Sequence, residues 1–331
     1  MSKVIELLRA VFRSQSKSAR INFVYRASKN YKSVENQILD LIKAELPDHI
    51  HRDTLKALYE PRANEVSFDL FIRGTADVLM SHGVADKNYM LIGDGDGGKL
   101  VNRRKHLLVP GPWLKRRLLK NQKIALLDNQ IHCVGWPRLD QLLRLQAERV
   151  ENKDVDGIAR KPRVLWAPTH DRARRGDDQL STSSYPEFEK YIPLLESKYE
   201  IETALHPRNR KSKKPTVDKL LDADYVISDF GTMVYEAWAL GKPVIFPSWL
   251  IGDRIIEYLP GSAEALIFKK KIGLHATCIE DVIEFIDQGA GLDEKVHQFL
   301  DDYLSPEYRG CSSRRVAELL LQFSQEEYVS E

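Results

Sequence analysis

The sequence predicts an α/β protein built from two doubly wound parallel sheets. Apolar strand-like runs alternate with helical patterns along almost the whole chain, and short connections join them. This alternation is typical of parallel sheets covered by helices on both faces. The 331 residues are enough for two domains of about 150 residues each. No internal repeat or low-complexity tract interrupts the pattern.

The elements of the first half follow from these runs. The segments INFVYRA, TADVLMSH, HLLVPG and IHCVG predict strands, and Ser33 to Leu46 and Gly111 to Leu119 predict helices. The polar stretch AERVENKDVDGIARKPR then breaks the periodicity and predicts a linker.

The second half repeats the alternation. The segments RVLWAP, YEIETALHP, DYVISD and PVIFP predict strands. We expect helices from about Pro186 to Lys198, through Leu220, and from about Thr232.

The composition is that of a soluble globular protein, with 43% apolar and 30% charged residues. The formal net charge is only +2, so attraction to anions must come from local clusters. Cys133, Cys278 and Cys311 are an odd number at unrelated spacings, which argues against a disulfide framework or a zinc site and fits a reducing cytoplasm. No apolar run reaches the roughly 18 residues that cross a bilayer, and no signal peptide is evident.

The first 20 residues form a basic amphipathic pattern. Apolar positions recur at near-helical spacing, and five Lys or Arg residues outnumber a single Glu. Such a helix fits the surface of an anionic membrane. It also fits a surface helix packed on its own domain, and both interpretations stay open.

The turn after DYVIS is the first candidate site. Ser228 ends a predicted strand, Asp229 and Gly231 lie in the turn, and Thr232 opens a helix. Ligands of such sheets bind where strands lead into helix starts, and the first amide groups of a helix attract phosphate. The alternative is that a side chain of the turn only caps the helix.

A second glycine-rich segment, GDGDGGKL from Gly93 to Leu100, matches the spacing of a P-loop. Leu100 stands where a magnesium-binding Ser or Thr is needed, and Asp94 and Asp96 would repel a triphosphate. We therefore interpret the segment as a loop.

Two histidines end predicted strands, one in each half. His82 follows the VLM strand and precedes a glycine, and an imidazole there can take a proton from an attacking hydroxyl. His206 is followed by a basic run that includes Arg208 and can contact a diphosphate. The alternatives are satisfied structural histidines and a solvated loop. Glu236, one turn into the Thr232 helix, fits either ribose binding or the helix dipole.

Several motifs together resemble the CDP-glycerol:polyol glycerophosphotransferase family. They are SHGVADK, VPGP, CVGWPRLDQLL, VLWAPTHD, LHPR, DADYVISDFGTMVYEAWALGKPVIF and YRGCSSRRVAELL, spread from about residue 75 to residue 320. The resemblance implies a GT-B fold, with two Rossmann-like domains facing across a cleft and a C-terminal helix returning to the first domain. We expect an acceptor-side domain over residues 1–155, a donor-binding domain over 156–305 and the returning helix over 306–331.

The resemblance also implies roles for matching residues. His82 corresponds to the catalytic base, and His206 to a histidine that contacts the donor phosphates, with Arg208 close by. Ser228, Gly231 and Thr232, with Asp229 between them, replace the turn that grips diphosphate. Thr169 would face the same cleft.

Two departures from the family pattern affect these roles. The usual His-Gly-Thr-Pro-Leu-Lys reads His-Gly-Val-Ala-Asp-Lys here, so the acceptor side can differ. His170 and Arg172 stand where Phe-Arg is usual, which leaves the register of the arginine open.

The implied function is transfer of a polyol phosphate, such as glycerol phosphate, from a CDP-activated donor to an acceptor hydroxyl with release of CMP. The product would be a teichoic-acid or capsular polymer and the acceptor a saccharide or lipid-linked saccharide. We expect no resident metal, although Mg²⁺ can bind through the donor phosphates. We expect no nucleic-acid partner, and a cytoplasmic location that leaves contact with the inner membrane face open.

Two alternatives remain open from the sequence. One is a GT-B glycosyltransferase or sugar-nucleotide 2-epimerase using a UDP- or GDP-sugar, because SDFGTMVYEAWALGKPV is close to the epimerase turn. The lysine soon after SHG favours phosphotransfer. The other is a GT-B protein that binds a nucleotide without turnover.

Overall fold

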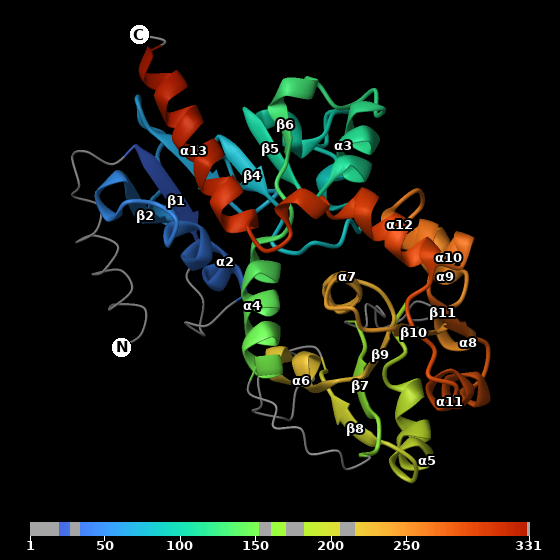
Figure 1. The fold of residues 1–331 in the computed structure, drawn as a ribbon. Helices are drawn as coiled ribbons and strands as arrows, with labels where there is room; N and C mark the ends of the chain where they lie inside the picture. The colour runs from blue at the N-terminus through green and yellow to red at the C-terminus, as the bar shows by residue number, and fades with distance from the viewer. Residues whose placement is uncertain (1–19, 27–33, 152–159, 170–181, 206–215, 330–331) are drawn as a thin grey trace. The chain divides into compact units, whose positions relative to one another are not determined.

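The computed structural model divides the chain into two compact units (Figure 1). It describes residues 20–26, 34–151, 160–169, 182–205 and 216–329. Unit 1 comprises Met1–His82, Tyr89–Gln141 and Asp302–Glu331, and unit 2 comprises Gly83–Asn88 and Leu142–Asp301. Six residues that directly follow His82 therefore belong to the compact unit formed mainly by the second half of the chain.

Unit 1 contains a six-stranded parallel sheet in the order β2-β1-β3-β4-β5-β6. The strands are β1 (Ile21–Tyr25), β2 (His51–Leu55), β3 (Val66–Asp69), β4 (Val78–Met80), β5 (His106–Val109) and β6 (Ile131–Cys133). Most of their side chains are buried, as expected for a parallel sheet covered on both faces.

The helices of unit 1 are α2 (Val34–Lys43), α3 (Pro112–Leu119), the first part of α4 (Pro137–Glu151) and α13 (Ser312–Val329). The C-terminal helix α13 packs on α2, β1 and β3. Its Phe323 ring stacks on His106, with 3.8 Å between centroids. The last helix of the chain thus completes the unit in which the chain begins.

The GWPRLD motif holds the start of α13. The Asp140 carboxylate accepts hydrogen bonds from the amides of Ser312 and Ser313 at 3.0 and 2.7 Å. The Trp136 amide donates to Ser312 Oγ at 2.8 Å. Gly135 has a φ of 72°, and a Cβ there would lie 2.3 Å from Ser312 Oγ, so only glycine fits. This part of the family resemblance therefore has a structural explanation within unit 1.

Unit 2 contains a five-stranded parallel sheet in the order β11-β10-β9-β7-β8. The strands are β7 (Arg163–Ala167), β8 (Glu200–Thr203), β9 (Tyr225–Ser228), β10 (Val244–Pro247) and β11 (Leu274–Ala276). The helices are α5 (Ile192–Glu196), α6 (Thr216–Asp222), α7 (Thr232–Ala239), α8 (Ser248–Ile251), α9 (Arg254–Tyr258), α10 (Ala263–Lys270), α11 (Ile279–Asp287) and α12 (Glu294–Tyr303), which ends in unit 1.

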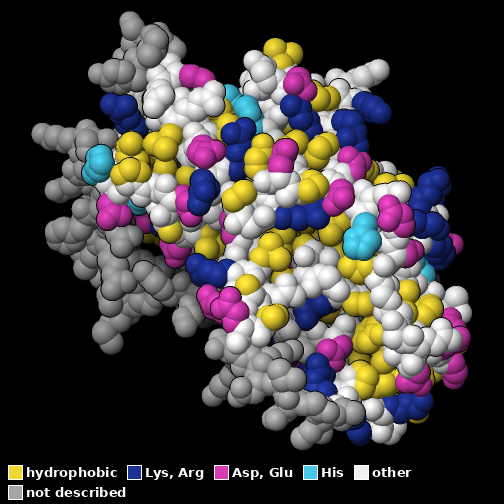
Figure 2. All heavy atoms as spheres, in the orientation of Figure 1, with side chains coloured by type: hydrophobic (Ala, Val, Ile, Leu, Met, Phe, Trp, Pro, Cys, Tyr) yellow, Lys and Arg dark blue, Asp and Glu magenta, His cyan; other side chains and the backbone are white. Residues whose placement is uncertain are grey.

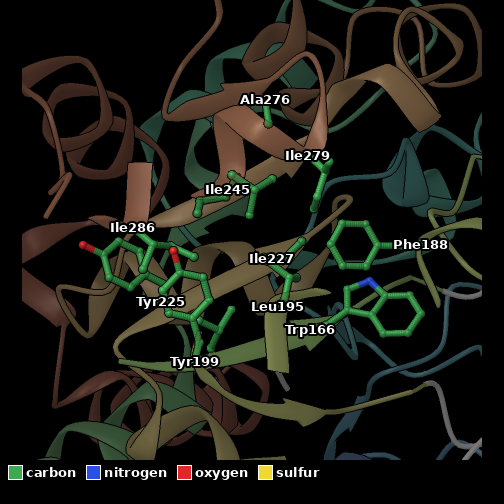
Figure 3. Close-up of a cluster of buried hydrophobic side chains, with 12 residues drawn as sticks. Trp166, Phe188, Leu195, Tyr199, Tyr225, Ile227, Ile245, Ala276, Ile279 and Ile286 are labelled. Atoms are coloured by element: carbon green, nitrogen blue, oxygen red, sulfur yellow. The ribbon is translucent and has the colours of Figure 1, made fainter. Parts of the chain in front are cut away.

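One core of unit 2 lies between the sheet and α5 and α11. Figure 3 shows Trp166, Phe188 and Ile227 on one side of this cluster and Tyr199, Tyr225 and Ile286 on the other. Burying each large apolar side chain contributes roughly 1.5–3 kcal/mol. This packing fixes the end of β9, from which the candidate site begins.

Every strand run predicted from the sequence contains a strand of the structure, but three strands were missed. They are β2, β3 and β11, each of three to five residues. Polar residues interrupt them and are paired only in the fold: Ser67 Oγ of β3, for example, donates to Asp77. A polar residue inside a short strand hides the apolar run on which the prediction depends.

The predicted linker was partly wrong, because α4 continues through residue 151, whereas the polar stretch was expected to start at residue 147. Residues 152–159 of that stretch, and residues 1–19 of the amphipathic N-terminal segment, lie outside the described residues. The division into domains at residues 155 and 305 stays a prediction.

Charges of both signs are mixed on the face that Figure 2 shows, with Lys and Arg beside Asp and Glu. Within the described ranges, no helix combines the length and the apolar character needed to cross a bilayer.

Candidate functional site

The entrance to α7 is the centre of the candidate site. All four residues of β9 are buried, and the chain turns through Gly231 into the helix at Thr232. Gly231 has φ 110° and ψ −169°, backbone angles that would be strained for a residue with a side chain. No side chain caps this helix start among the described residues. Its first amide groups carry partial positive charge and are suited to an anion.

Ser228 and Asp229 point into the fold. Ser228 Oγ donates to the Ala167 carbonyl at 2.7 Å, and neither residue is exposed. The Asp229 carboxylate accepts from the amides of Thr169 and Ser184 at 2.9 and 3.0 Å. Burial raises the pKa of Asp229 to about 6. These two side chains order the turn, so we do not propose the predicted phosphate contact for them.

Thr169 and Glu236 also lie in unit 2. Thr169 follows β7, and its carbonyl accepts from Ser183 Oγ at 2.9 Å, so its backbone is tied on both sides. Glu236 is on α7 and only 1% exposed. Its predicted contact with ribose stays a prediction.

The segment Gly83–Asn88 lies against the α7 entrance within unit 2. A Cβ at Gly83 would come within 2.9 Å of Thr232 Oγ1, and one at Gly231 within 3.0 Å of Lys87 Nζ. The Lys87 ammonium also lies over the Phe230 ring, 4.8 Å from its centroid. The structure thus places a lysine, which the sequence analysis did not include among the site residues, at the start of α7. Its position five residues after His82 is the signal that could have identified it.

His82 belongs to unit 1 and follows β4. Its ring meets Tyr89 edge-on, with 5.0 Å between centroids. The Tyr89 hydroxyl in turn accepts from the Ile72 amide and donates to the Leu70 carbonyl. The tyrosine, held by these two hydrogen bonds, therefore lies against one side of the predicted base. His82 is otherwise exposed and directly precedes Gly83 in the chain.

Two predicted residues, His206 and Arg208, lie outside the described residues, as do His170 and Arg172. Their roles stay predictions. In the described part of the chain, no group of three or more His, Cys, Asp or Glu side chains is placed to hold a metal.

The glycine-rich segment Gly93–Leu100 is a loop, as expected. Residues Gly93 and Lys99 form an isolated antiparallel bridge. Asp94 Oδ1 accepts from the amides of Asp96 and Gly98 at 2.9 and 3.0 Å. The carboxylate of the loop thus occupies the amides that a P-loop would offer to phosphate.

Known proteins resemble this chain in sequence and in fold. No family model matches the sequence. The teichoic acid glycerol-phosphate primase of Bacillus subtilis (strain 168) is 24% identical, over 43% of this chain and 42% of the primase. The structure of the wall teichoic acid polymerase TagF matches with a TM-score of 0.60 and 15% identity, over 98% of this chain and 97% of the TagF chain. The chain has the fold of TagF.

A variant of the same polymerase soaked with CDPG matches with a TM-score of 0.56 and 14% identity, over 98% of this chain and 96% of that chain. These likenesses confirm the predicted α/β fold with two doubly wound parallel sheets, of the GT-B class. They also confirm the resemblance to the glycerophosphotransferase family. The match to the primase spans less than half the length of that relative.

Proposed function

We propose that this protein transfers a polyol phosphate from a CDP-activated donor to an acceptor hydroxyl, with release of CMP, in the synthesis of a cell-surface polymer. The observation that carries the proposal is the uncapped, glycine-led start of α7 on a fold shared with TagF. The likeness to a glycerol-phosphate primase supports the same reaction class. Glycerol phosphate is the transferred group that the names of these relatives favour.

In the proposed reaction the acceptor oxygen attacks the phosphorus that carries the polyol. The P–O bond to CMP breaks, CMP leaves with the electron pair, and His82 takes the proton of the acceptor hydroxyl. Little covalent chemistry is asked of the protein, so catalysis is mainly alignment and neutralisation of charge on phosphate oxygens.

The donor phosphates would rest on the amides of Gly231 and Thr232. His206 and Arg208 would add a hydrogen-bond donor and a fixed cation, and Glu236 would accept from the ribose. Any Mg²⁺ would bind through the donor phosphates. We further propose a cytoplasmic site of action, with the acceptor a saccharide or lipid-linked saccharide at the inner membrane face.

Replacing His82 with alanine tests the base. We expect kcat to fall by about 10²–10⁴-fold, the usual contribution of a general base, with CDP affinity nearly unchanged. His297, an exposed histidine of α12, provides the matched control His297→Ala. Release of CMP from CDP-glycerol is the measurement. Wild-type turnover in His82→Ala would exclude the base assignment.

Screening of donors tests the reaction itself. We expect CMP from CDP-glycerol or CDP-ribitol in the presence of a saccharide acceptor. Release of UDP from a UDP-sugar, or its inversion, would instead identify the sugar-nucleotide class, and binding without any product would identify a non-catalytic protein.

A further inference from the structure

Lys87 brings a positive charge to the start of α7. Its ammonium lies beside Gly231 at the start of α7, where the helix already presents partial positive charge. The same ammonium lies over the Phe230 ring, a contact that favours the cation at this position. An anion at the same point would be attracted both to the Lys87 ammonium and to the partial positive charge of the helix start.

Two buried carboxylates hold the chain at this lysine and at the residue before it. Glu264 of α10 accepts from the amides of Asp86 and Lys87 at 3.0 and 2.9 Å. Asp86 in return accepts from the Ala263 amide at the start of α10, at 3.1 Å. Glu264 and Asp86 are only 1% and 3% exposed. Both carboxylates therefore accept from backbone amides, and this arrangement sets the path of the segment.

Glu264 also ties the segment to the helix that carries the site. The Tyr235 hydroxyl of α7 donates to Glu264 Oε1 at 2.9 Å. The backbone of Lys87 and Asn88 is left-handed, with φ 43° and 55°, which non-glycine residues adopt only when their surroundings enforce it. One carboxylate thus joins α7, α10 and the strained turn that presents Lys87.

We propose that Lys87 binds the donor diphosphate together with the first amides of α7, and that Glu264 is the positioning residue that holds Lys87 there. The inference rests on the proposed function and deepens it, because it adds a fixed cation to the donor site. The anionic ligand is a nucleoside diphosphate. In this role the lysine neutralises charge on phosphate oxygens and transfers no proton.

Titration calorimetry with CDP on the full chain tests the role of the lysine. Lys87→Met keeps the alkyl stem over Phe230 and removes the charge, and we expect CDP affinity to fall by about tenfold or more, as for a lost charge-assisted phosphate contact. Lys87→Arg should recover most of the affinity. Lys270→Met, in the last turn of α10, removes the same charge from the same unit and should leave the affinity within about twofold.

A double-mutant cycle tests the positioning residue. Glu264→Gln places an amide group opposite backbone donors, and we expect a loss of CDP affinity similar to that of Lys87→Met. In the Lys87→Met background the same change should cost little, because the cation that Glu264 positions is already gone. A purely structural glutamate would give the full loss in both backgrounds, and that result would overturn the positioning role.

The outcomes separate this inference from the proposed function. CDP binding by Lys87→Met at the wild-type level, or an equal loss in Lys87→Arg, would overturn the role of Lys87. A preference of the unaltered chain for UDP, with the same loss in Lys87→Met, would overturn the proposed donor and leave the lysine in place. Failure of the unaltered chain to bind CDP, UDP and GDP would overturn both.

Discussion

The starts of α7 and α10, both in unit 2, differ in what faces their first amide groups. At α10, Ser262 Oγ accepts from the Ala265 amide at 3.0 Å, and the Asp86 carboxylate accepts from the Ala263 amide at 3.1 Å. At α7, a glycine stands at the cap position, no side chain caps the helix within the described residues, and a lysine ammonium lies close by. Side-chain oxygen atoms accept hydrogen bonds from the first amides of α10, whereas a lysine ammonium lies near the first amides of α7.

The difference shows that the positive start of a helix can serve two purposes. A helix start is positive at either place, and its effect depends on whether the protein supplies the acceptors. At α10 the acceptors fold the chain, because Asp86 brings the Gly83–Asn88 segment to unit 2. At α7 the acceptors would come from the donor diphosphate. Three substitutions test this difference: one adds an acceptor at the start of α7, one alters the turn before α7, and one removes an acceptor at the start of α10.

The largest effect is expected from Gly231→Asp, which would make α7 resemble α10. The new carboxylate would face the helix amides and Lys87, and the side chain would strain a backbone with φ 110°. We expect CDP affinity to fall by about 100-fold, or about 3 kcal/mol, as for loss of charge-assisted contacts plus backbone strain. Titration calorimetry provides the measurement.

Gly241→Asp is the matched control. Gly241 also has a positive φ, 74°, at the other end of α7, and no atom lies within 4 Å of a Cβ built there. We expect this variant to lose stability while keeping CDP affinity. Equal affinity losses in the two variants would show that strain in α7, rather than the open start, sets the affinity.

An intermediate effect is expected from Asp229→Asn, which alters the support of the turn before α7. The pKa of Asp229 is raised to about 6 by burial from an ordinary value of 3.8. The Asp229 carboxyl group therefore holds its proton more tightly in the folded chain than in the unfolded chain. The stability that this proton contributes is present at low pH and is lost as the pH rises from about 4 through 6. Linkage gives a total of about 3 kcal/mol, of which about 2 kcal/mol is lost between pH 4.5 and 7.5.

We expect the asparagine variant to lack this decline, so its stability relative to the unaltered chain should increase between pH 4.5 and 7.5. Urea unfolding across that range provides the measurement. Parallel pH curves for the two chains would mean that Asp229 titrates at its ordinary value.

The smallest effect is expected from Ser262→Ala, which partly opens the start of α10. Loss of this cap should reduce the free energy of unfolding by about 1 kcal/mol. CDP affinity should stay within about twofold, because α10 is not proposed to meet the donor. A tenfold loss of affinity would show that the two starts are coupled.

Local patterns foretold much of the fold and part of the site. The strand runs around INFVYRA and DYVISD and the helix at Thr232 were predicted because apolar periodicity and a Gly-Thr turn are local signals. The strand Val66–Asp69 was missed because its serine and aspartate interrupt the apolar pattern, and only the fold pairs them with Asp77 and Arg104. Ser228 was expected to contact phosphate, but its hydroxyl donates to Ala167, a partner 61 residues away that no local pattern reveals.

The sequence by itself determined the alternation of strands and helices, the glycine that directly precedes the helix at Thr232, and the resemblance that points to polyol-phosphate transfer. These are properties of neighbouring residues, and short-range sterics and hydrogen bonding decide them. Only the tertiary structure decided that Gly83–Asn88 belongs to unit 2, that Glu264 fixes Lys87 beside Gly231, and that Asp140 anchors the last helix. Each of these depends on a buried or half-buried carboxylate meeting backbone amides more than 170 positions away, and loss of solvent at such a carboxylate favours the pairing without leaving a local trace in the sequence.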